Sequence, residues 1–329
     1  MANGSDSFSY TASLLRRVEV ALTKDPSAIK RTLNRRRAII GDQNAIEQDE
    51  KANAALTMLR EGEVPEPKQM EALEFVIRMM RPAPWFEEGE LRPLPQQAAQ
   101  LFNDWPQFGV KIKPYLRSIG RIDRVTPVEP VKATDNTIGT GFVVSYERDL
   151  LITNKHVLND LSSGSFKLEK GQAVVSFQRE FNTIPEEDPV NIISVADVSS
   201  TLDIALLKLE KTVFSDGRQA IPFNLEPAAD DLPVVAVGFP CDDGRNPLFV
   251  KPLFGENFGV KRAAPGLIAG SDTDYYFHDC STLGGNSGSP LLSMKDASLV
   301  GLHHEGKFTY RNEAIKTTLV KNFLEPHLN

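Results

Sequence analysis

Ser287 lies in the run LGGNSGSP at residues 283–290, which combines a hydroxyl nucleophile with neighbouring glycines. Glycines permit a tight turn with positive φ. Such a turn can aim the backbone amides of Gly285 and Ser287 at one point and form an oxyanion hole beside the serine. An ordinary glycine–serine hairpin loop is the alternative. A lipase-like nucleophile elbow does not fit, because it needs glycine where this chain has Ser289.

Two further motifs supply groups that could activate a hydroxyl. In LLITNKHVL, residues 150–158, His156 comes at the end of an apolar strand and is a candidate general base. In TLDIALLKL, residues 201–209, Asp203 precedes a buried strand and could accept the imidazole N–H. Taken singly, the histidine could be a half-buried structural imidazole and the aspartate only the start of a strand.

The order of the three residues is more informative than any one motif. His156, Asp203 and Ser287 follow one another at intervals of 47 and 84 residues, which is the order found in chymotrypsin-like proteases. With GTGFVVS before them, the motifs resemble those of bacterial trypsin-like serine peptidases, over about residues 119–325. The resemblance implies that Ser287 is the nucleophile, His156 the general base and then acid, and Asp203 the residue that orients the imidazole. It also implies an oxyanion hole made by the amides of Gly285 and Ser287.

The residue before the serine bears on activation. Secreted trypsin-type zymogens have an aspartate there, which pairs with a new N-terminus after cleavage, whereas this chain has Asn286. A neutral amide cannot supply that ion pair. We therefore expect activity without proteolytic processing.

Four residues form the specificity pocket that the resemblance implies: Ser281, Thr282, His303 and Gly306. Ser281 stands where the trypsin subgroup has an aspartate, so a basic P1 residue is not expected. Thr282 and His303 match the glutamyl endopeptidase pattern, in which a hydroxyl and an imidazole bind a carboxylate or carboxamide. A small or apolar P1 residue is the alternative, because GLHHEG could be a strand with solvent-facing histidines and Glu305 would repel an acidic side chain.

Histidines and cysteines are scarce, which limits other chemistries. The five histidines are at 156, 278, 303, 304 and 327, and His278 is expected to support the pocket wall. Cys241 and Cys280 are too few for a disulfide framework and are expected to be free thiols. Neither residue type is spaced as a zinc site, so no metal and no cofactor are expected.

Charge and hydropathy exclude two classes of partner. Residues 1–115 hold 16 Lys or Arg and 16 Asp or Glu, whereas the remainder holds 21 and 28, so the net charge of −7 lies in the C-terminal two thirds. This distribution gives no basic surface for nucleic acid. No apolar run approaches a membrane span, and no secretory signal is visible. A cytoplasmic location is expected.

The pattern of apolar residues divides the chain into a helical front and a β-rich remainder. Helices are predicted across residues 11–60 with a restart at Gly41-Asp42, and from Pro67 to Arg81-Pro82. PAPWFEEGELRPLP, residues 82–95, is predicted to be a turn rather than a packed element. From Ile119 onward, short β-branched runs predict antiparallel strands. A long loop is expected at 241–262, and a last helix over KTTLVKNFLEPHL, residues 316–328.

These observations predict two domains: a helical N-terminal domain, residues 1–118, and an all-β trypsin-like domain, residues 119–329. The second domain is expected to contain two six-stranded antiparallel β-barrels of the chymotrypsin type, with a C-terminal helix. The expected function is that of a bacterial serine endopeptidase acting on polypeptides. The alternative is a catalytically silent or latent peptide-binding module. The front, which lacks histidine and cysteine, is expected to bind a protein partner or self-associate.

Overall fold

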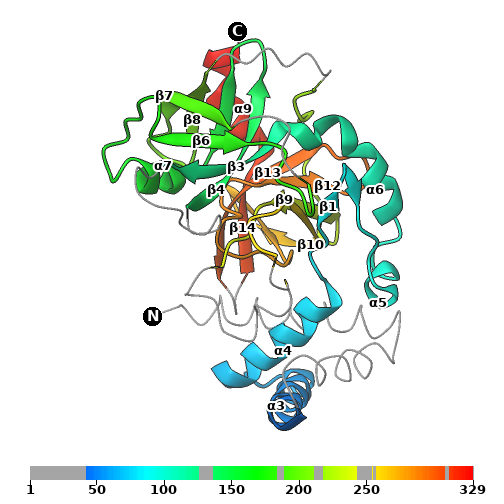
Figure 1. Ribbon diagram of the computed structural model, residues 1–329. Helices are drawn as coiled ribbons and strands as arrows, with labels where there is room; N and C mark the ends of the chain where they lie inside the picture. The colour runs from blue at the N-terminus through cyan, green and yellow to red at the C-terminus, as the bar shows by residue number, and fades with distance from the viewer. Residues whose placement is uncertain are drawn as a thin grey trace.

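The computed structural model describes residues 42–125, 136–183, 189–210, 218–242, 254, 257–307 and 311–328 (Figure 1). Helix predictions before residue 42 lie outside these ranges, as does most of the predicted loop at 241–262. No helix within the described ranges is long and apolar enough to cross a membrane.

The first β-barrel closes through six antiparallel strands in the order β3-β4-β5-β8-β7-β6. Their bounds are β3 Ile119–Arg124, β4 Thr137–Ser145, β5 Leu150–Thr153, β6 Ala173–Ser176, β7 Val190–Val198 and β8 Ala205–Leu209. A short helix, α7 Lys155–Leu161, follows β5 directly.

The second barrel closes in the order β10-β11-β14-β13-β12-β9. Its strands are β9 Pro233–Gly238, β10 Arg262–Ser271, β11 Tyr275–His278, β12 Pro290–Ser293, β13 Leu299–Lys307 and β14 Arg311–Lys316. Helix α9, Thr317–Leu328, packs on β13 and β14. The predicted fold of two six-stranded antiparallel barrels is confirmed.

Many strands are buried on both faces, which explains their continuous apolar runs. Along β5, Leu151 points into a core cluster that fills the first barrel, whereas Leu150 and Ile152 belong to a second cluster outside it. β9 alternates in the same way, with Val234 in the core of the second barrel and Val235 in the outer cluster. Successive side chains on a strand point to opposite faces. The outer cluster therefore joins the two barrels.

The segment before β3 completes this outer cluster. It contains α5 Gln96–Ala99, α6 Trp105–Lys111 and the 3-10 helix η1 Lys113–Ser118, and it buries a series of large side chains against both barrels. The buried members are Phe86, Leu94, Phe102, Trp105, Phe108, Ile112 and Leu116. Residues 86–118 thus pack as part of the barrel body.

The prediction that residues 82–95 form an unpacked turn is wrong. Strands β1 Phe86–Glu87 and β2 Glu90–Leu91 form a two-residue hairpin, with φ of 53° at Glu88 and 77° at Gly89. Two positive φ values are those of a type I′ turn, whose twist matches that of paired strands. Phe86 is fully buried, and Trp85 pairs with Arg262 at the start of β10. The prolines flank the hairpin and do not prevent its packing.

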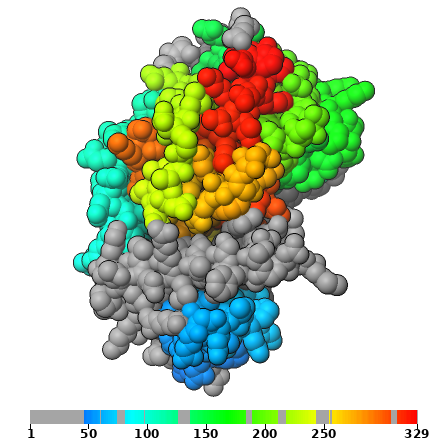
Figure 2. All heavy atoms as spheres, turned by 180° about the vertical axis from the view of Figure 1, so that it is seen from behind, coloured from blue at the N-terminus to red at the C-terminus, as the bar shows by residue number. Residues whose placement is uncertain are grey.

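Two helices precede this segment, α3 Asp42–Arg60 and α4 Pro67–Met80, as predicted. They pack on each other through small and branched apolar residues, among them Ala55, Leu59 and Leu73. Figure 1 shows the pair at one end of the molecule, and in Figure 2 it forms the blue lobe. Just after α4, Arg81 makes a buried ion pair with Asp279, at the end of β11.

Candidate active site

His156 is placed by the junction of β5 and α7. The strand ends at Thr153, Asn154 precedes the helix, and His156 is the second helical residue rather than the end of the strand as predicted. The Asn154 side chain, fully buried, donates through Nδ2 to the backbone oxygen of Asp203 at 2.9 Å. The helix start and the segment before β8 are therefore tied together beneath the imidazole.

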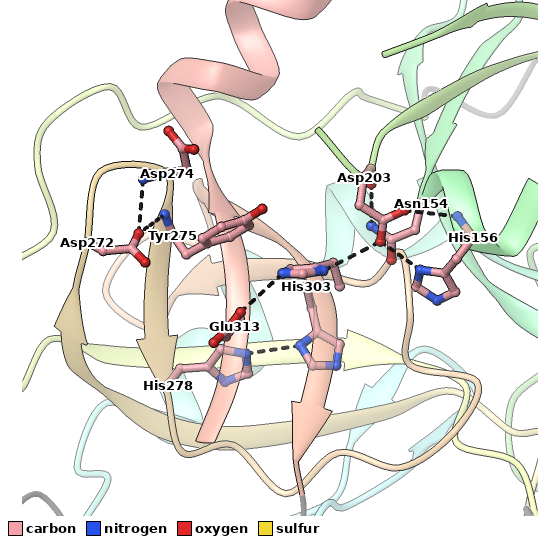
Figure 3. Close-up of polar contacts among 10 residues, drawn as sticks. Asn154, His156, Asp203, Asp272, Asp274, Tyr275, His278, His303 and Glu313 are labelled. Atoms are coloured by element: carbon pink, nitrogen blue, oxygen red, sulfur yellow. Dashed lines mark hydrogen bonds and ion pairs between the residues drawn. The ribbon is translucent and has the colours of Figure 1, made fainter. Parts of the chain in front are cut away.

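Asp203 contacts His156 twice. Its Oδ1 accepts the backbone N–H of His156 at 2.9 Å, and its Oδ2 lies 2.6 Å from Nδ1 of the ring (Figure 3). Burial raises the pKa of Asp203, but hydrogen bonds from His156 and His304 outweigh burial and hold that pKa well below its usual range. An ionised carboxylate at Nδ1 fixes the tautomer in which Nε2 is free to accept a proton.

Ser287 lies between two glycines in left-handed conformation, Gly285 with φ of 87° and Gly288 with φ of 86°. Side chains would not fit at either glycine. A Cβ at Gly285 would lie 2.3 Å from the carbonyl oxygen of Phe239, and one at Gly288 would lie 2.0 Å from that of Thr140. Within the described ranges, the amides of Gly285 and Ser287 donate no hydrogen bond, so both are available to a ligand.

The first barrel holds the serine turn in place through Thr140 of β4. Its backbone N–H donates to the oxygen of Ser287 at 2.8 Å, and its hydroxyl donates to the oxygen of Gly285 at 2.7 Å. The same hydroxyl accepts from the N–H of Phe239 at 3.2 Å. Thr140 lies in GTGFVVS, but its role was not predicted, because the contact joins residues about 145 positions apart.

The predicted site residues converge where the barrels meet. Gly139 lies between the serine turn and Val157, the residue after His156. A Cβ at Gly139 would lie 2.8 Å from Val157 Cγ2 and 3.1 Å from the backbone oxygen of Ser287, so the close approach requires glycine. On the other side, Gly288 N donates to His303 O at 2.9 Å. Ser287 Oγ makes no hydrogen bond with His156 in the part of the chain that the structure describes. Such contacts are often long before substrate binds.

Of the predicted pocket residues, Ser281, Thr282 and His303 are buried and Gly306 is exposed. Thr282 donates from its hydroxyl to Asn312 Oδ1 at 3.1 Å, and Asn312 Nδ2 donates to the oxygen of Cys280 at 2.6 Å. A Cβ at Gly306 would lie 2.6 Å from the same Asn312 oxygen. The Ser281 hydroxyl is buried, with no hydrogen-bond partner among the described residues. Asn312, on β14, was not predicted, since no motif marks it.

His278 and His303 form a buried pair. Nε2 of His278 lies 3.1 Å from Nδ1 of His303, with the rings edge to face (Figure 3). Burial lowers the pKa of His278 to about 4. Burial, and then the neighbouring imidazoles, hold the pKa of His303 well below its usual value. Both rings are therefore neutral at pH 7, and the other nitrogen of His278, Nδ1, has no hydrogen-bond partner among the described residues.

Among the described residues, no cluster of three or more His, Cys, Asp or Glu side chains could hold a metal ion. Cys241 and Cys280 form no disulfide, as predicted. Burial raises the pKa of the Cys280 thiol far above its ordinary value, so that this cysteine is not a nucleophile.

Part of the chain is similar to known proteins. The family model of the trypsin-like peptidase domain matches residues 139–302. No curated protein matches the chain in sequence. Among solved structures, the serine endoprotease from Yersinia pestis is similar, with 20% identity and a TM-score of 0.47 over 67% of this chain and 65% of that one. The chain thus spans about two thirds of that protein's length. Residues 139–302, which carry His156, Asp203 and Ser287, are thus similar to the trypsin-like peptidase domain.

Proposed function

We propose that this protein is a serine endopeptidase in which Ser287, His156 and Asp203 act as the catalytic triad. The observation that carries the proposal is the double contact of Asp203 with His156, at 2.9 and 2.6 Å, beside a serine turn clamped by Thr140. The matching family model supports the same chemistry.

In the proposed reaction, His156 Nε2 takes the proton of Ser287 as its oxygen attacks the substrate carbonyl. The amides of Gly285 and Ser287 stabilise the oxyanion that forms. His156 then gives the proton to the departing amine, which leaves an acyl-enzyme. Water, activated by His156, hydrolyses this ester, and the proton returns to Ser287. Asp203 stays ionised throughout and stabilises the imidazolium.

The protein is proposed to act without proteolytic activation. Asn286, before the nucleophile, is buried and donates from Nδ2 to the oxygen of Leu283 at 3.3 Å. This bond is local to the turn, so the turn does not need an inserted N-terminus to hold its shape. Purified full-length protein that is inert until it is cut near residue 118 would contradict this part of the proposal.

The pocket is proposed to select Gln or Glu at P1, and not Lys or Arg. With His303 neutral, its Nε2–H can donate to a carboxamide oxygen, while the Ser281 hydroxyl is free to bond. A Glu carboxylate would bind more tightly if the His303 imidazole took up a proton. The rate of cleavage after Glu should therefore fall as pH rises, whereas the rate of cleavage after Gln should not. Mapping cleavage sites on a denatured proteome at pH 5.5 and 8 tests this. Small or apolar P1 residues at both pH values would refute it.

For residues 1–118 we propose a recruiting role that resides in the helices up to α4. Residues 86–118 are part of the barrel body, so a test should remove only residues 1–80 and keep Arg81 with its partner Asp279. We expect the shortened chain to react with a serine-directed probe as fast as the full chain, and to differ in mass in solution or in bound partner. Equal mass and equal partners would argue for a structural role alone.

Labelling with a fluorophosphonate probe tests the proposed function itself. The full chain should be labelled on Ser287, and Ser287→Ala should abolish the label. Ser289→Ala is the matched control, because this hydroxyl lies in the same turn but is buried. Full labelling of Ser287→Ala would refute the assigned nucleophile. A chain that is never labelled but binds peptides would favour the peptide-binding module.

A further inference from the structure

His304 occupies an irregular position on β13. Where β13 pairs with β14, His303 lies opposite Ala314 and Glu305 lies opposite Glu313. The register shifts by one residue between these pairs, so His304 has no partner of its own on β14. Such a β-bulge re-aims side chains that would otherwise alternate between the two faces of the sheet. The result is that the side chains of His303 and His304 are both largely withdrawn from solvent, with that of His304 only 12% exposed.

The bulge directs His304 to two carboxylates from different barrels. Its Nδ1 lies 3.5 Å from Oδ2 of Asp203, and its Nε2 lies 3.6 Å from Oε2 of Glu313 on β14. The ring stacks on Tyr275 of β11, with 4.9 Å between centroids. The Asp203 oxygen that His304 approaches is the one that contacts His156 at 2.6 Å. Two imidazoles therefore share one carboxylate oxygen.

The charges around His304 favour its protonated form. Facing it are Asp203 and His156 from the first barrel and Glu313, Tyr275 and His278 from β14 and β11, with His303 and Glu305 on its own strand. Burial lowers the pKa of His304, but Asp203 and then Glu313 outweigh burial and raise it to about 9. His278 and His303 are neutral, so His304 carries the positive charge of this histidine group at pH 7.

We propose that His304 is a positioning residue: as an imidazolium held by Glu313, it fixes the ionised Asp203 of the first barrel against His156. This inference rests on the triad proposed above. It adds a link that crosses the barrel interface, from Glu313 through His304 and Asp203 to His156.

This link predicts the direction in which loss of His304 shifts the pH dependence of the reaction. The positive charge of His304 offsets part of the charge of Asp203, so His156 loses its proton more readily. Without His304, Asp203 acts on His156 alone, and a lower proton concentration is needed to free Nε2. The acid limb of the activity profile then moves to higher pH by about one unit, the size of shift that one nearby charge produces.

The test compares the second-order rate of fluorophosphonate labelling of Ser287 against pH in the full chain and in His304→Gln and Glu313→Gln. We expect His304→Gln to move the acid limb up by about one pH unit, which is about a tenfold slower reaction below the midpoint. His304→Lys, which keeps a cation, should restore the midpoint. By NMR, the His304 ring of the wild-type chain should titrate near pH 9, and Glu313→Gln should lower this midpoint by a unit or more.

A control matches the pair that is removed. His327→Gln breaks another histidine–carboxylate pair, with Asp197 at 2.7 Å. It should not move the acid limb. An unchanged limb in His304→Gln, or a His304 ring that titrates near 6.5, would overturn the inference. Ser287→Ala decides the proposed function independently, since labelling of that variant would refute the triad whatever the titration of His304.

Discussion

The two barrels share a strand number and a closed antiparallel order, but they differ in what they bury. The first barrel has an apolar core with members such as Val143 and Leu151, and it also buries Asp123, which pairs with Arg121 and accepts from Thr137. The polar side chains that the second barrel buries include the histidine pair and the Thr282–Asn312 contact. The buried polar groups of the second barrel therefore include proposed pocket residues, whereas the first barrel contributes His156 and Asp203 from segments next to β5 and β8.

The barrels also present their functional groups differently. The first presents His156 on a regular helix start and Asp203 before a strand, both supported by backbone contacts. The second presents Ser287 on a left-handed glycine turn and His304 on a β-bulge. Because the proposed triad draws on both barrels, the contacts between the barrels, such as those of Thr140 with the serine turn, are expected to set the geometry of the site. Predictions therefore target these contacts.

The largest effect is expected from Asp203→Asn. The amide would preserve the shape of the site but offer an N–H or a neutral oxygen to His156, so the wrong tautomer would be favoured. A rate loss of about 10⁴ is expected, measured as Ser287 labelling or peptide hydrolysis at pH 7. The control is Asp197→Asn, which breaks another histidine–carboxylate pair, between Asp197 on β7 and His327 on α9. It should leave the rate within about a factor of two of wild type. A comparable loss in both variants would mean that the effect is not specific to the site.

A smaller effect is expected from Thr140→Val, which removes the barrel contact on the serine turn while nearly keeping the volume. The oxygen of Gly285 and the N–H of Phe239 would each lose a hydrogen-bond partner. We expect about a 10- to 100-fold slower labelling of Ser287, together with a loss of about 1–3 kcal/mol in the free energy of unfolding.

Thr137→Val is the matched control for this prediction. Thr137 lies on the same strand, and its hydroxyl also donates to a buried acceptor, Asp123 Oδ1 at 3.1 Å. It should show the stability loss without the loss of rate. If Thr140→Val slowed labelling no more than this control, the serine turn would hold its shape without the first barrel.

The smallest effect on rate is expected at a buried lysine between the barrels. Lys261, before β10, donates from Nζ to the oxygens of Leu116 at 2.6 Å and Phe177 at 2.7 Å. Lys261→Met would leave both carbonyls without this donor, and we expect a loss of about 2 kcal/mol in stability at pH 7. The labelling rate of the folded protein should remain near that of wild type. A rate loss as large as that of Thr140→Val would show that barrel docking as a whole, and not one contact, sets the site.

Lys261 also predicts a dependence of stability on pH. Burial lowers its pKa to about 7 in the folded protein, below its ordinary value of 10.5. Between these two values the unfolded chain binds a proton that the folded chain does not, so stability rises with pH across this window. Denaturant unfolding at pH 7 and 10 should show a gain of a few kcal/mol in wild type relative to Lys261→Met. An equal pH dependence in both proteins would contradict the assignment.

Local patterns explain why much of the fold could be predicted. Helix α4 begins at Pro67 and ends at Met80, before Arg81-Pro82, because proline is tolerated in a first helical turn and excludes the helix beyond it. The hairpin at residues 86–91 was missed because its prolines suggested a turn, while its burial depends on a surface that only the assembled barrels provide. Local sequence signals were therefore sufficient to predict helix α4, whose ends depend on neighbouring residues. They were insufficient for the hairpin, whose packing depends on a surface distant in the sequence.

Strand periodicity and turn residues, which are local properties of the chain, predicted an antiparallel β-rich domain, and the resemblance of four motifs to bacterial trypsin-like peptidases implied its two barrels and the three residues of the proposed triad. Only the tertiary structure decided that Thr140 clamps the serine turn, that Asn312 bonds to the proposed pocket residue Thr282 and that His304 reaches Asp203. These contacts join strands from distant parts of the chain, and His304 depends on a one-residue shift in pairing between β13 and β14. Strand register is set by the packing of the closed barrel as a whole, so no short stretch of residues records it.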